Sequence, residues 1–320
     1  MSFTLLGILN SQAAGGVAYW LATLSGASDE TGRGVAVDSS SSVFGFGETE
    51  SAGSGDRAFL LAKRDASGTI QWQRVLGGAG EDYGQSVAVD SSNNAYVLGY
   101  TSSTTPDYTT DILLAKYNSA GTLQWQRNLG GSSSTQGFSI TVDSSANVYV
   151  TGLTYSTGAG ASDVILAKYN SSGTIQWQRS YDDTGDAAAA ACDSSGNVYV
   201  TSLSFTVAKF NTSGTIQWQR GLGNATGSAI TLDSDDNLYA FGTTNTNKFI
   251  MAKLPNDGSL TGSYSVGGSS HNYSSAGFSV ATSTLTASTS SLTAATSSIS
   301  ADTPSLSNGS ASLTSDLVQL

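Results

Sequence analysis

The chain has 320 residues, of which 38% are hydrophobic, so it can form one large domain or two ordinary domains with a real core. Only 12% of its residues are charged, and its 37 glycines, together with many Ser, Thr and Asn residues, favour turns and strands over helices. The net charge of −11 opposes nonspecific binding to nucleic acid or anionic lipid, and the single cysteine excludes a disulfide within the chain.

The N-terminal residues read MSFTLLGILN and contain no basic residue before the apolar run. Gly7 and Asn10 interrupt that run, and no stretch of about 18 apolar residues follows it. We therefore expect neither a signal peptide nor a membrane span.

One segment of eight residues occurs four times, as SGTIQWQR at residues 67–74, 172–179 and 213–220 and as AGTLQWQR at residues 120–127. Alignment on Trp20, Trp72, Trp125, Trp177 and Trp218 gives steps of 52, 53, 52 and 41 residues. The same frame aligns a recurring Asp (positions 38, 90, 143, 193 and 233) and a recurring Lys (positions 63, 116, 168, 209 and 253). Each copy contains four short runs of β-branched or aromatic residues, which predict strands joined by turns.

Four antiparallel strands in a repeat of roughly 40 to 50 residues are typical of a β-propeller blade. The recurring elements, such as AVDSSNNAYVLG and ILLAKYN, resemble the SBBP-type β-propeller repeat over residues 20–268, and this resemblance implies an all-β propeller. A partial sixth copy follows, in which Gly262 replaces the Trp and Ser283 replaces the Asp. We predict six blades, the last completed by residues near SFTLLGIL, with five blades as the alternative, and we expect Trp72, Trp125, Trp177 and Trp218 to be buried at equivalent positions.

The sequence thus divides into residues 1–16 (an N-terminal anchor or closing segment), residues 17–283 (the propeller) and residues 284–320 (a Ser/Thr-rich tail). In the tail, Leu285, Leu292, Ile299, Leu306, Leu313 and Leu320 are seven residues apart. A coiled coil needs two apolar seams per heptad, and Pro304 and Gly309 also interrupt the tail. A flexible tail, a repetitive β stalk or trimer-forming fibre segment, and a helix remain open alternatives.

No residue pattern indicates catalysis or a cofactor. His271 is the only histidine and has no acidic neighbour in sequence, while Cys192 aligns with valines of a core strand. The DSDDN segment at residues 233–237 lacks the Gly and Glu of a calcium loop, and a zinc site has too few ligands. We expect the recurring Asp to bind its own turn, and the recurring Lys and Arg to bridge strands or blades.

The connections between strands differ on the two faces of the predicted propeller. One face carries uniform turns such as DSSNN, whereas the other carries long, divergent loops in the first three repeats. Such loops are common binding sites, and aromatic rings with carboxylates suit glycans, although these groups can also be merely solvated. The candidate ligand-binding residues are Tyr83, Tyr108, Tyr155, Glu50, Asp56, Asp82 and Asp107.

The opening segment MSFTLLGILNSQAAGG resembles the N-terminal segment of virion-associated proteins of marine tailed bacteriophages, where it precedes otherwise unrelated domains. The resemblance implies a non-enzymatic virion protein, either a tail fibre or a capsid decoration, that uses its propeller for adhesion or assembly. Its partners would be other virion proteins and a host-surface glycan, with homo-oligomer formation through the tail. The alternatives are a bacterial surface or secreted propeller that binds glycan or protein, and a propeller enzyme.

Overall fold

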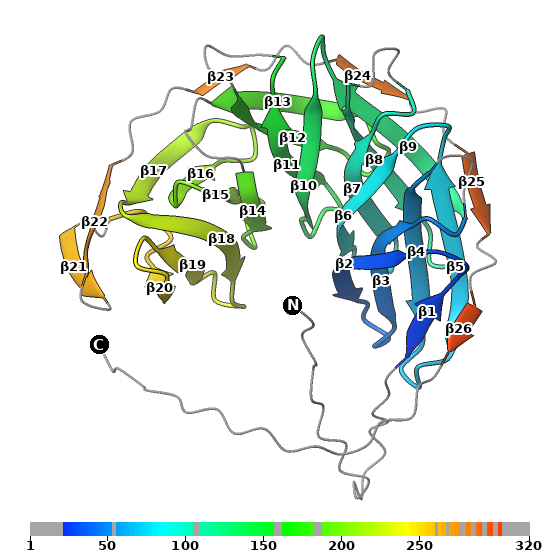
Figure 1. The fold of residues 1–320 in the computed structure, drawn as a ribbon. Helices are drawn as coiled ribbons and strands as arrows, with labels where there is room; N and C mark the ends of the chain where they lie inside the picture. Colours follow the sequence, from blue (N-terminus) through cyan, green and yellow to red (C-terminus); the bar gives the residue numbers. More distant parts are fainter. Residues whose placement is uncertain are drawn as a thin grey trace, which may run out of the picture.

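The computed structural model describes residues 22–52, 56–104, 109–156, 162–181, 187–259, 262–266, 269–275, 280–282, 286–289, 293–296 and 300–302. Every helix or strand in these ranges is a β-strand. The strands form five blade-like sheets that stand side by side in an arc, and the arc is open between its two ends (Figure 1). No helix in the described ranges is long and apolar enough to cross a membrane. The chain is therefore an all-β propeller, as its repeats predict.

Each of the first four blades contains four consecutive antiparallel strands, and the tryptophan lies in the outer strand. The strands are β2 (Glu30–Val37), β3 (Val43–Thr49), β4 (Ala58–Arg64) and β5 (Ile70–Gly77) in blade 1; β6 (Asp82–Val89), β7 (Ala95–Thr101), β8 (Asp111–Tyr117) and β9 (Leu123–Gly130) in blade 2; β10 (Thr135–Val142), β11 (Val148–Thr154), β12 (Asp163–Tyr169) and β13 (Ile175–Tyr181) in blade 3; β14 (Ala187–Cys192), β15 (Val198–Ser202), β16 (Thr206–Phe210) and β17 (Ile216–Leu222) in blade 4. Blade 5 contains three strands, β18 (Ala225–Leu232), β19 (Leu238–Thr244) and β20 (Phe249–Leu254).

Apolar side chains fill the space between neighbouring blades. Phe46 and Phe59 of blade 1 form one cluster with Val97 and Leu113 of blade 2, and the two phenylalanine rings meet edge to face with centroids 5.2 Å apart. The middle strands of a blade are covered on both faces, so every residue of β11 is buried. This burial explains why apolar residues occupy both faces of β11, as in Val148, Tyr149 and Val150, rather than alternating with polar residues.

The recurring aspartate binds its own turn, as predicted. Asp90 Oδ1 accepts hydrogen bonds from the backbone N–H groups of Ser92 and Asn94, each at 2.9 Å, and Oδ2 accepts the Tyr96 hydroxyl at 2.9 Å. Burial raises the pKa of Asp90, but the hydrogen bonds from the Asn94 side-chain amide, together with those just named, outweigh it and leave the pKa below the ordinary value. Equivalent bonds recur at Asp38, Asp143, Asp193 and Asp233, so the DSDDN segment forms an ordinary turn.

The repeated octapeptide couples each blade to the next one. Trp125 of blade 2 donates its indole N–H to the carbonyl of Ser171, 3.1 Å away in the β12–β13 turn of blade 3. Lys116 donates to the same carbonyl at 3.2 Å, and Arg127 donates its Nε–H to the Gly173 carbonyl at 2.8 Å. In blades 2, 3 and 4, the SGT half of the octapeptide accepts hydrogen bonds from the previous blade, while the WQR half donates hydrogen bonds to the following blade.

The same coupling recurs at Trp72, Trp177 and Trp218, whose indoles donate to the β8–β9 and β16–β17 turns and to the turn after β20. The prediction that the tryptophans occupy equivalent positions is confirmed. The prediction that they are buried is wrong, because each indole is only half-buried. The rings lie at the outer rim of the blades, where the turn of the next blade covers one side of them.

We predict that Gly173→Ala destabilises the protein more than Gly196→Ala does. Both glycines have similar left-handed backbones, with φ of +76° and +77°, so alanine costs each on the order of 1 kcal/mol. A Cβ at Gly173 would lie 2.7 Å from the Trp125 ring, whereas the nearest atom at Gly196 would be 3.4 Å away. Overpacking should add about 1 to 3 kcal/mol at Gly173 alone. Urea unfolding measures both free energies, and equal losses would contradict the coupling.

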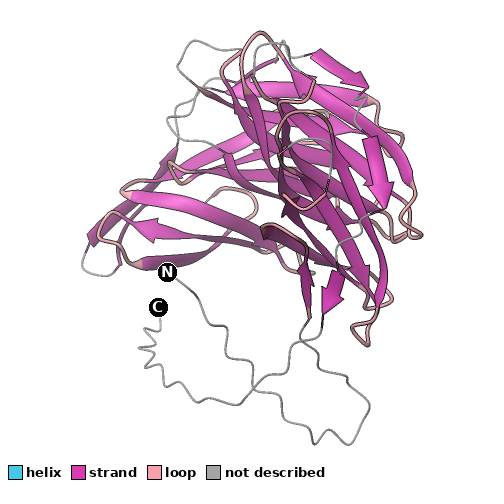
Figure 2. Cartoon of the chain, turned by 45° about the vertical axis from the view of Figure 1, so that its right-hand side comes forward, coloured by secondary structure: helices cyan, strands magenta, loops and turns pink. Residues whose placement is uncertain are grey.

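The part of the chain that follows blade 5 supplies an additional strand to the outer edges of the propeller sheets. β22 (Ser269–Ser275) pairs with β17, β23 (Val280–Thr282) with β13, β24 (Thr286–Thr289) with β9, β25 (Thr293–Thr296) with β5, and β26 (Ser300–Asp302) with β1 (Thr23–Ser25). These strands, named the belt here, follow the outside of the arc from blade 4 back to blade 1 (Figures 1 and 2).

One heptad of the tail corresponds to one blade. Thr286 pairs with Gly130 of blade 2 and Thr293 with Gly77 of blade 1, so a shift of seven residues in the belt matches one repeat of the propeller. Ser300 pairs with Ser25, one further heptad and one further repeat away. The described part of the tail therefore forms β-strands and no helix, and these strands pair with the propeller sheets instead of forming a separate stalk.

Deletion of one whole heptad, residues 286–292, should preserve the belt, because the remaining strands can shift by one blade and pair in the same register. Deletion of four residues, 289–292, should shift every following strand out of register and lower the melting temperature more. Circular dichroism during heating compares the two variants. If the four-residue deletion is no more damaging than the seven-residue deletion, the heptad does not set the register.

The preferred count of six blades is wrong for the described residues, which contain five blades, the alternative count. The segment aligned with a sixth copy forms β21 (Gly262–Val266) and β22, a hairpin that extends blade 4 outward. β1 aligns with the outer strand of a blade that would precede blade 1, and it pairs with β26. Residues 1–16, predicted to anchor the chain or close the ring, lie outside the described residues.

Candidate recognition surface

The two faces of the arc carry different connections. On the loop face, the connections within blades 1, 2 and 3 span residues 50–57, 102–110 and 155–162, whereas those of blades 4 and 5 span only residues 203–205 and 245–248. The opposite face, named the turn face here, carries the aspartate turns and the turns whose backbone carbonyls accept hydrogen bonds from the tryptophan indoles. Because short connections suffice to join the strands, the longer loops provide surface beyond what the fold requires.

A cluster of charged and aromatic side chains lies on the loop face at the junction of blades 1 and 2. Arg57 donates to Glu50 at 2.6 Å, and its guanidinium lies over the Tyr83 ring, 4.7 Å from the centroid. Tyr83 stacks on Tyr100 with centroids 4.9 Å apart and an interplanar angle of 23°. The Tyr83 hydroxyl donates to Glu81. These five residues, named the Tyr83 cluster here, hold one another in defined orientations.

Backbone contacts fix this cluster to the scaffold. The Arg57 carbonyl accepts the N–H of Asp82 at 3.1 Å, and the Glu81 carbonyl accepts the N–H of Ser102 at 2.9 Å. Arg57 and Glu81 also form a parallel β-bridge between the loop of blade 1 and the start of blade 2. The side chains therefore stand on paired backbone, which limits the conformational entropy lost when a ligand binds.

The hydrogen bond to Glu81 raises the pKa of Tyr83 to about 12, because ionisation would remove the donor and place two negative oxygens side by side. Burial raises the pKa of Tyr100, and the hydrogen bond to Glu50 raises the pKa of Arg57. At neutral pH the cluster thus presents neutral phenols beside a permanent cation. It can exchange hydrogen bonds with a polar ligand, but it contains no activated nucleophile.

The structure brings together two of the predicted ligand-binding residues, Glu50 and Tyr83. Tyr155 lies apart on blade 3 and is 51% exposed, and Asp56 is exposed beside Arg57. Asp107 and Tyr108 lie outside the described residues.

Asp82, also predicted to bind ligand, is fully buried. It accepts hydrogen bonds from the Gly78 N–H at 2.9 Å and the Ser103 hydroxyl at 3.0 Å, and burial raises its pKa. These contacts stabilise the connection between blades 1 and 2, so Asp82 has no surface to offer a ligand.

Sequence reasoning missed Arg57 and the neighbouring ion pair between Arg33 and Glu48, at 3.0 Å. The available signal was that neither arginine belongs to the repeated QWQR element. Arg57 lies in a variable loop and Arg33 at a position where blades 2 and 3 have Gln85 and Phe138. A charged residue that does not recur in the other repeats cannot be explained by the contacts that every repeat makes.

The residues considered for catalysis do not converge with this surface. Cys192 is half-buried in blade 4, and burial raises the pKa of its thiol far above the ordinary value, which makes it a poor nucleophile. His271 lies in the belt strand β22, opposite Tyr264 of β21. Among the described residues, no group of three or more His, Cys, Asp or Glu side chains could hold a metal ion.

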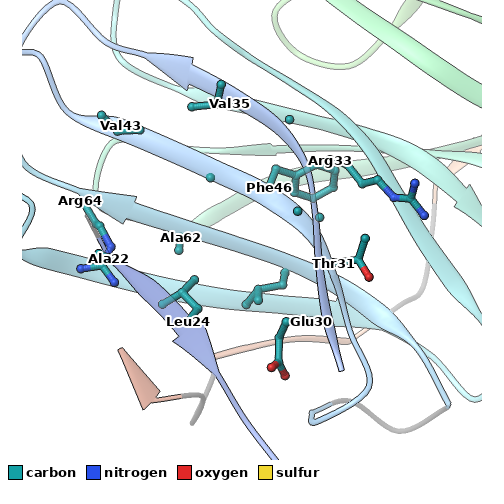
Figure 3. Close-up of a pocket in the computed structure, with 15 residues that line it drawn as sticks. Ala22, Leu24, Glu30, Thr31, Arg33, Val35, Val43, Phe46, Ala62 and Arg64 are labelled. Atoms are coloured by element: carbon teal, nitrogen blue, oxygen red, sulfur yellow. The ribbon is translucent and has the colours of Figure 1, made fainter. Parts of the chain in front are cut away.

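A groove of about 590 Å³ lies on the free face of blade 1 at one end of the arc (Figure 3). Its lining includes Leu24 of β1 together with Val35, Ala62 and Arg64 of blade 1. The equivalent residues of blade 2 are buried against blade 1. The groove therefore marks the space that a blade preceding blade 1 would fill, and its polar lining residues are Glu30, Thr31, Arg33 and Arg64.

We predict that Glu81→Gln lowers the pKa of Tyr83 from about 12 toward the ordinary value near 10. The amide can still accept the phenolic hydrogen bond, but it does not repel the phenolate. Tyrosinate absorbance at alkaline pH measures the change, with Tyr83→Phe identifying the contribution of this ring. An unchanged titration in Glu81→Gln would show that the carboxylate does not control Tyr83.

Residues 71–104 and 124–158 match the sequence model of the SBBP Beta-propeller repeat. No curated protein sequence matches the chain. Among solved structures, the chain is similar to a gluconolactonase from Xanthomonas campestris, with 15% identity, 69% of this chain and 72% of that chain covered, and a TM-score of 0.43. It is also similar to virginiamycin B lyase from Staphylococcus aureus, with 12% identity, 74% and 75% covered, and a TM-score of 0.46. The chain thus carries SBBP β-propeller repeats in two places, and each match runs from the outer strand of one blade into the first two strands of the next blade.

Proposed function

We propose that this protein is a non-enzymatic virion component of a tailed bacteriophage, a tail fibre or capsid decoration, whose propeller binds a partner through its loop face. The observation that carries the proposal is the difference between the two faces. The aspartate turns are alike in all five blades, whereas the loops of blades 1 to 3 are long, divergent and furnished with the Tyr83 cluster.

The chemistry of the loop face favours a polar, hydroxyl-rich ligand. The Tyr83 cluster offers carboxylates of Glu50 and Glu81 as acceptors and the Arg57 guanidinium as a donor. Tyr155, which is exposed on blade 3, offers an aromatic face that can stack on the C–H groups of a sugar ring. A host-surface glycan fits this combination, and the glycosylated or hydroxyl-rich surface of another virion protein presents the same chemistry.

Two further observations support the proposal. The net charge of −11 disfavours nucleic acid as the partner. The half-buried Cys192, with its raised thiol pKa, is unsuited to covalent catalysis. The virion assignment itself rests on the likeness of residues 1–16 to the N-terminal segment of phage virion proteins.

The test is a variant in which residues 50–57, 102–110 and 155–162 are each replaced by the three-residue connection found at residues 203–205. We expect it to fold but to lose binding to an array of bacterial surface oligosaccharides, or incorporation into phage particles. The matched control, Ser91→Lys with Ser144→Lys, alters exposed residues of the turn face and should bind as the parent does.

Binding and incorporation at the parental level in the loop variant would refute the assignment of the loop face. Glycan binding without any incorporation into particles, by either the parent or the control, would instead favour a bacterial surface or secreted propeller.

A further inference from the structure

Blade 5 is the one blade of the described structure that lacks an outer strand. Its sheet has the order β18-β19-β20, whereas blades 1 to 4 each contain a fourth strand that carries the tryptophan. The outer edge of β20 is therefore unpaired within the described ranges. An unpaired edge presents backbone N–H and C=O groups that another strand can bind.

β1 has the opposite composition, because it is an outer strand without the other three strands of a blade. In blade 1, Gly77 of β5 pairs with Thr293 of the belt. In β1, Ser25 pairs with Ser300, one heptad later. Gly77 and Ser25 both lie five residues after a tryptophan of the repeat. β1 therefore binds the belt in the register of an outer strand.

β1 also packs on blade 1 as an outer strand packs on the following blade. Leu24 of β1 belongs to the same apolar cluster as Leu60 of β4. The equivalent residues one repeat later, Leu76 of β5 and Leu113 of β8, likewise share a cluster at the junction of blades 1 and 2. The position of β1 is thus that of the outer strand of a blade that precedes blade 1.

The two ends of the arc expose the two halves of a junction between blades. Phe59 and Leu61 of blade 1 are 1% and 2% exposed, because blade 2 covers them. Their equivalents in blade 5, Phe249 and Met251, are 82% and 79% exposed. At the other end of the arc, Val35 is 69% exposed in the groove of blade 1. Blade 5 thus lacks a following blade, and blade 1 lacks a preceding one.

We propose that the arc closes into a five-bladed ring in which β1 becomes the outer strand of blade 5. The completed sheet has the order β18-β19-β20-β1-β26, which repeats the order β2-β3-β4-β5-β25 of blade 1. In blade 1, Phe59 pairs with Leu76, and the same register places Phe249 opposite Leu24. The belt, which pairs with blades 1 to 4 and with β1, then binds every blade of the ring.

The closure leaves the existing strand pairs intact. β1 uses one edge for β26 and β20 uses one edge for β19, so the new pair joins two edges that have no partner among the described strands. Blades 5 and 1 stand at the two sides of the opening (Figure 1). The four junctions between blades repeat the same contacts, so a small sliding movement at each of them adds up to a large movement of the ends. Because both ends belong to one chain, their effective concentration is high, which favours this contact over a second copy.

A disulfide between β1 and β20 tests the proposal. Leu24→Cys and Phe249→Cys are combined in the full chain, together with Cys192→Val, which introduces the residue that blades 1 to 3 have at this position. The control pair is Thr23→Cys with Phe249→Cys, in which the exposed Thr23 points to the opposite face of β1. Opposite residues of paired strands lie within reach of a disulfide, so mild oxidation should crosslink Leu24→Cys with Phe249→Cys within one chain about tenfold faster than the control pair.

A charge on the exposed face of blade 5 gives an independent test. In the closed ring blade 1 covers Met251, so in Met251→Lys either the charge is buried or the contact with blade 1 is lost. We expect this variant to melt about 5 °C below the parent. Asn245→Lys, the matched control, adds the same charge to the exposed β19–β20 connection and should melt as the parent does.

Disulfides that form only between two chains would assign the end faces to a second copy and overturn the proposal. Equal melting temperatures of Met251→Lys and Asn245→Lys would show that the face of blade 5 stays in water. Absent crosslinks, or equal rates for the two cysteine pairs, would show that β1 and β20 do not pair in this register. Each of these results would also overturn the proposal. None of the measurements involves the loop face, so their outcome is independent of the proposed function.

Discussion

The coupling between a tryptophan, an arginine and a lysine of one blade and a glycine turn of the next is the interaction on which the propeller depends. At the junction of blades 2 and 3, the donors of Trp125 and Arg127 meet the carbonyls of Ser171 and Gly173 at 3.1 and 2.8 Å. The indole can approach the turn only because Gly173 has no Cβ. Blade packing alone is nondirectional, whereas these hydrogen bonds set the position of each blade relative to its neighbour.

This coupling has a direction, so the two ends of the arc differ. Blades 2, 3 and 4 each donate hydrogen bonds to the next blade from one face and accept hydrogen bonds from the previous blade at the other face. Blade 5 consequently exposes the apolar face that earlier blades bury, with Phe249 and Met251 in solvent, and blade 1 exposes the receiving face with its groove (Figure 3). The belt does not depend on this coupling, because it binds the outer edges of the sheets through backbone pairing. The fold thus combines two independent means of holding neighbouring blades together.

The candidate recognition surface lies on loops that can vary because the repeated contacts elsewhere hold the blades together. Since the octapeptide and the aspartate turn provide the contacts between blades, the loops on the opposite face can vary without loss of those contacts. The Tyr83 cluster forms at the junction of two blades, where a loop of blade 1 meets the first strand of blade 2. Its aromatic stack and ion pair orient the exposed groups before any ligand arrives, which reduces the ordering that binding requires.

The structure of one blade could be predicted from the amino-acid sequence. The repeat spacing, the alternation of short apolar runs with Asp, Asn and Gly turns, and the recurring Trp, Lys and Arg predicted the strands, the turns and the structural role of the basic residues, because each depends on contacts within one repeat or between adjacent copies. The position of the tail became clear only in the folded protein, because its period of seven residues has to be compared with the distance between blades, and no local propensity contains that distance. The tertiary structure also decided which loop residues meet. Asp82 is buried and Arg57 joins Tyr83 because residues from two blades converge, and that convergence depends on how the blades pack, a relation that the spacing of residues along the chain does not encode.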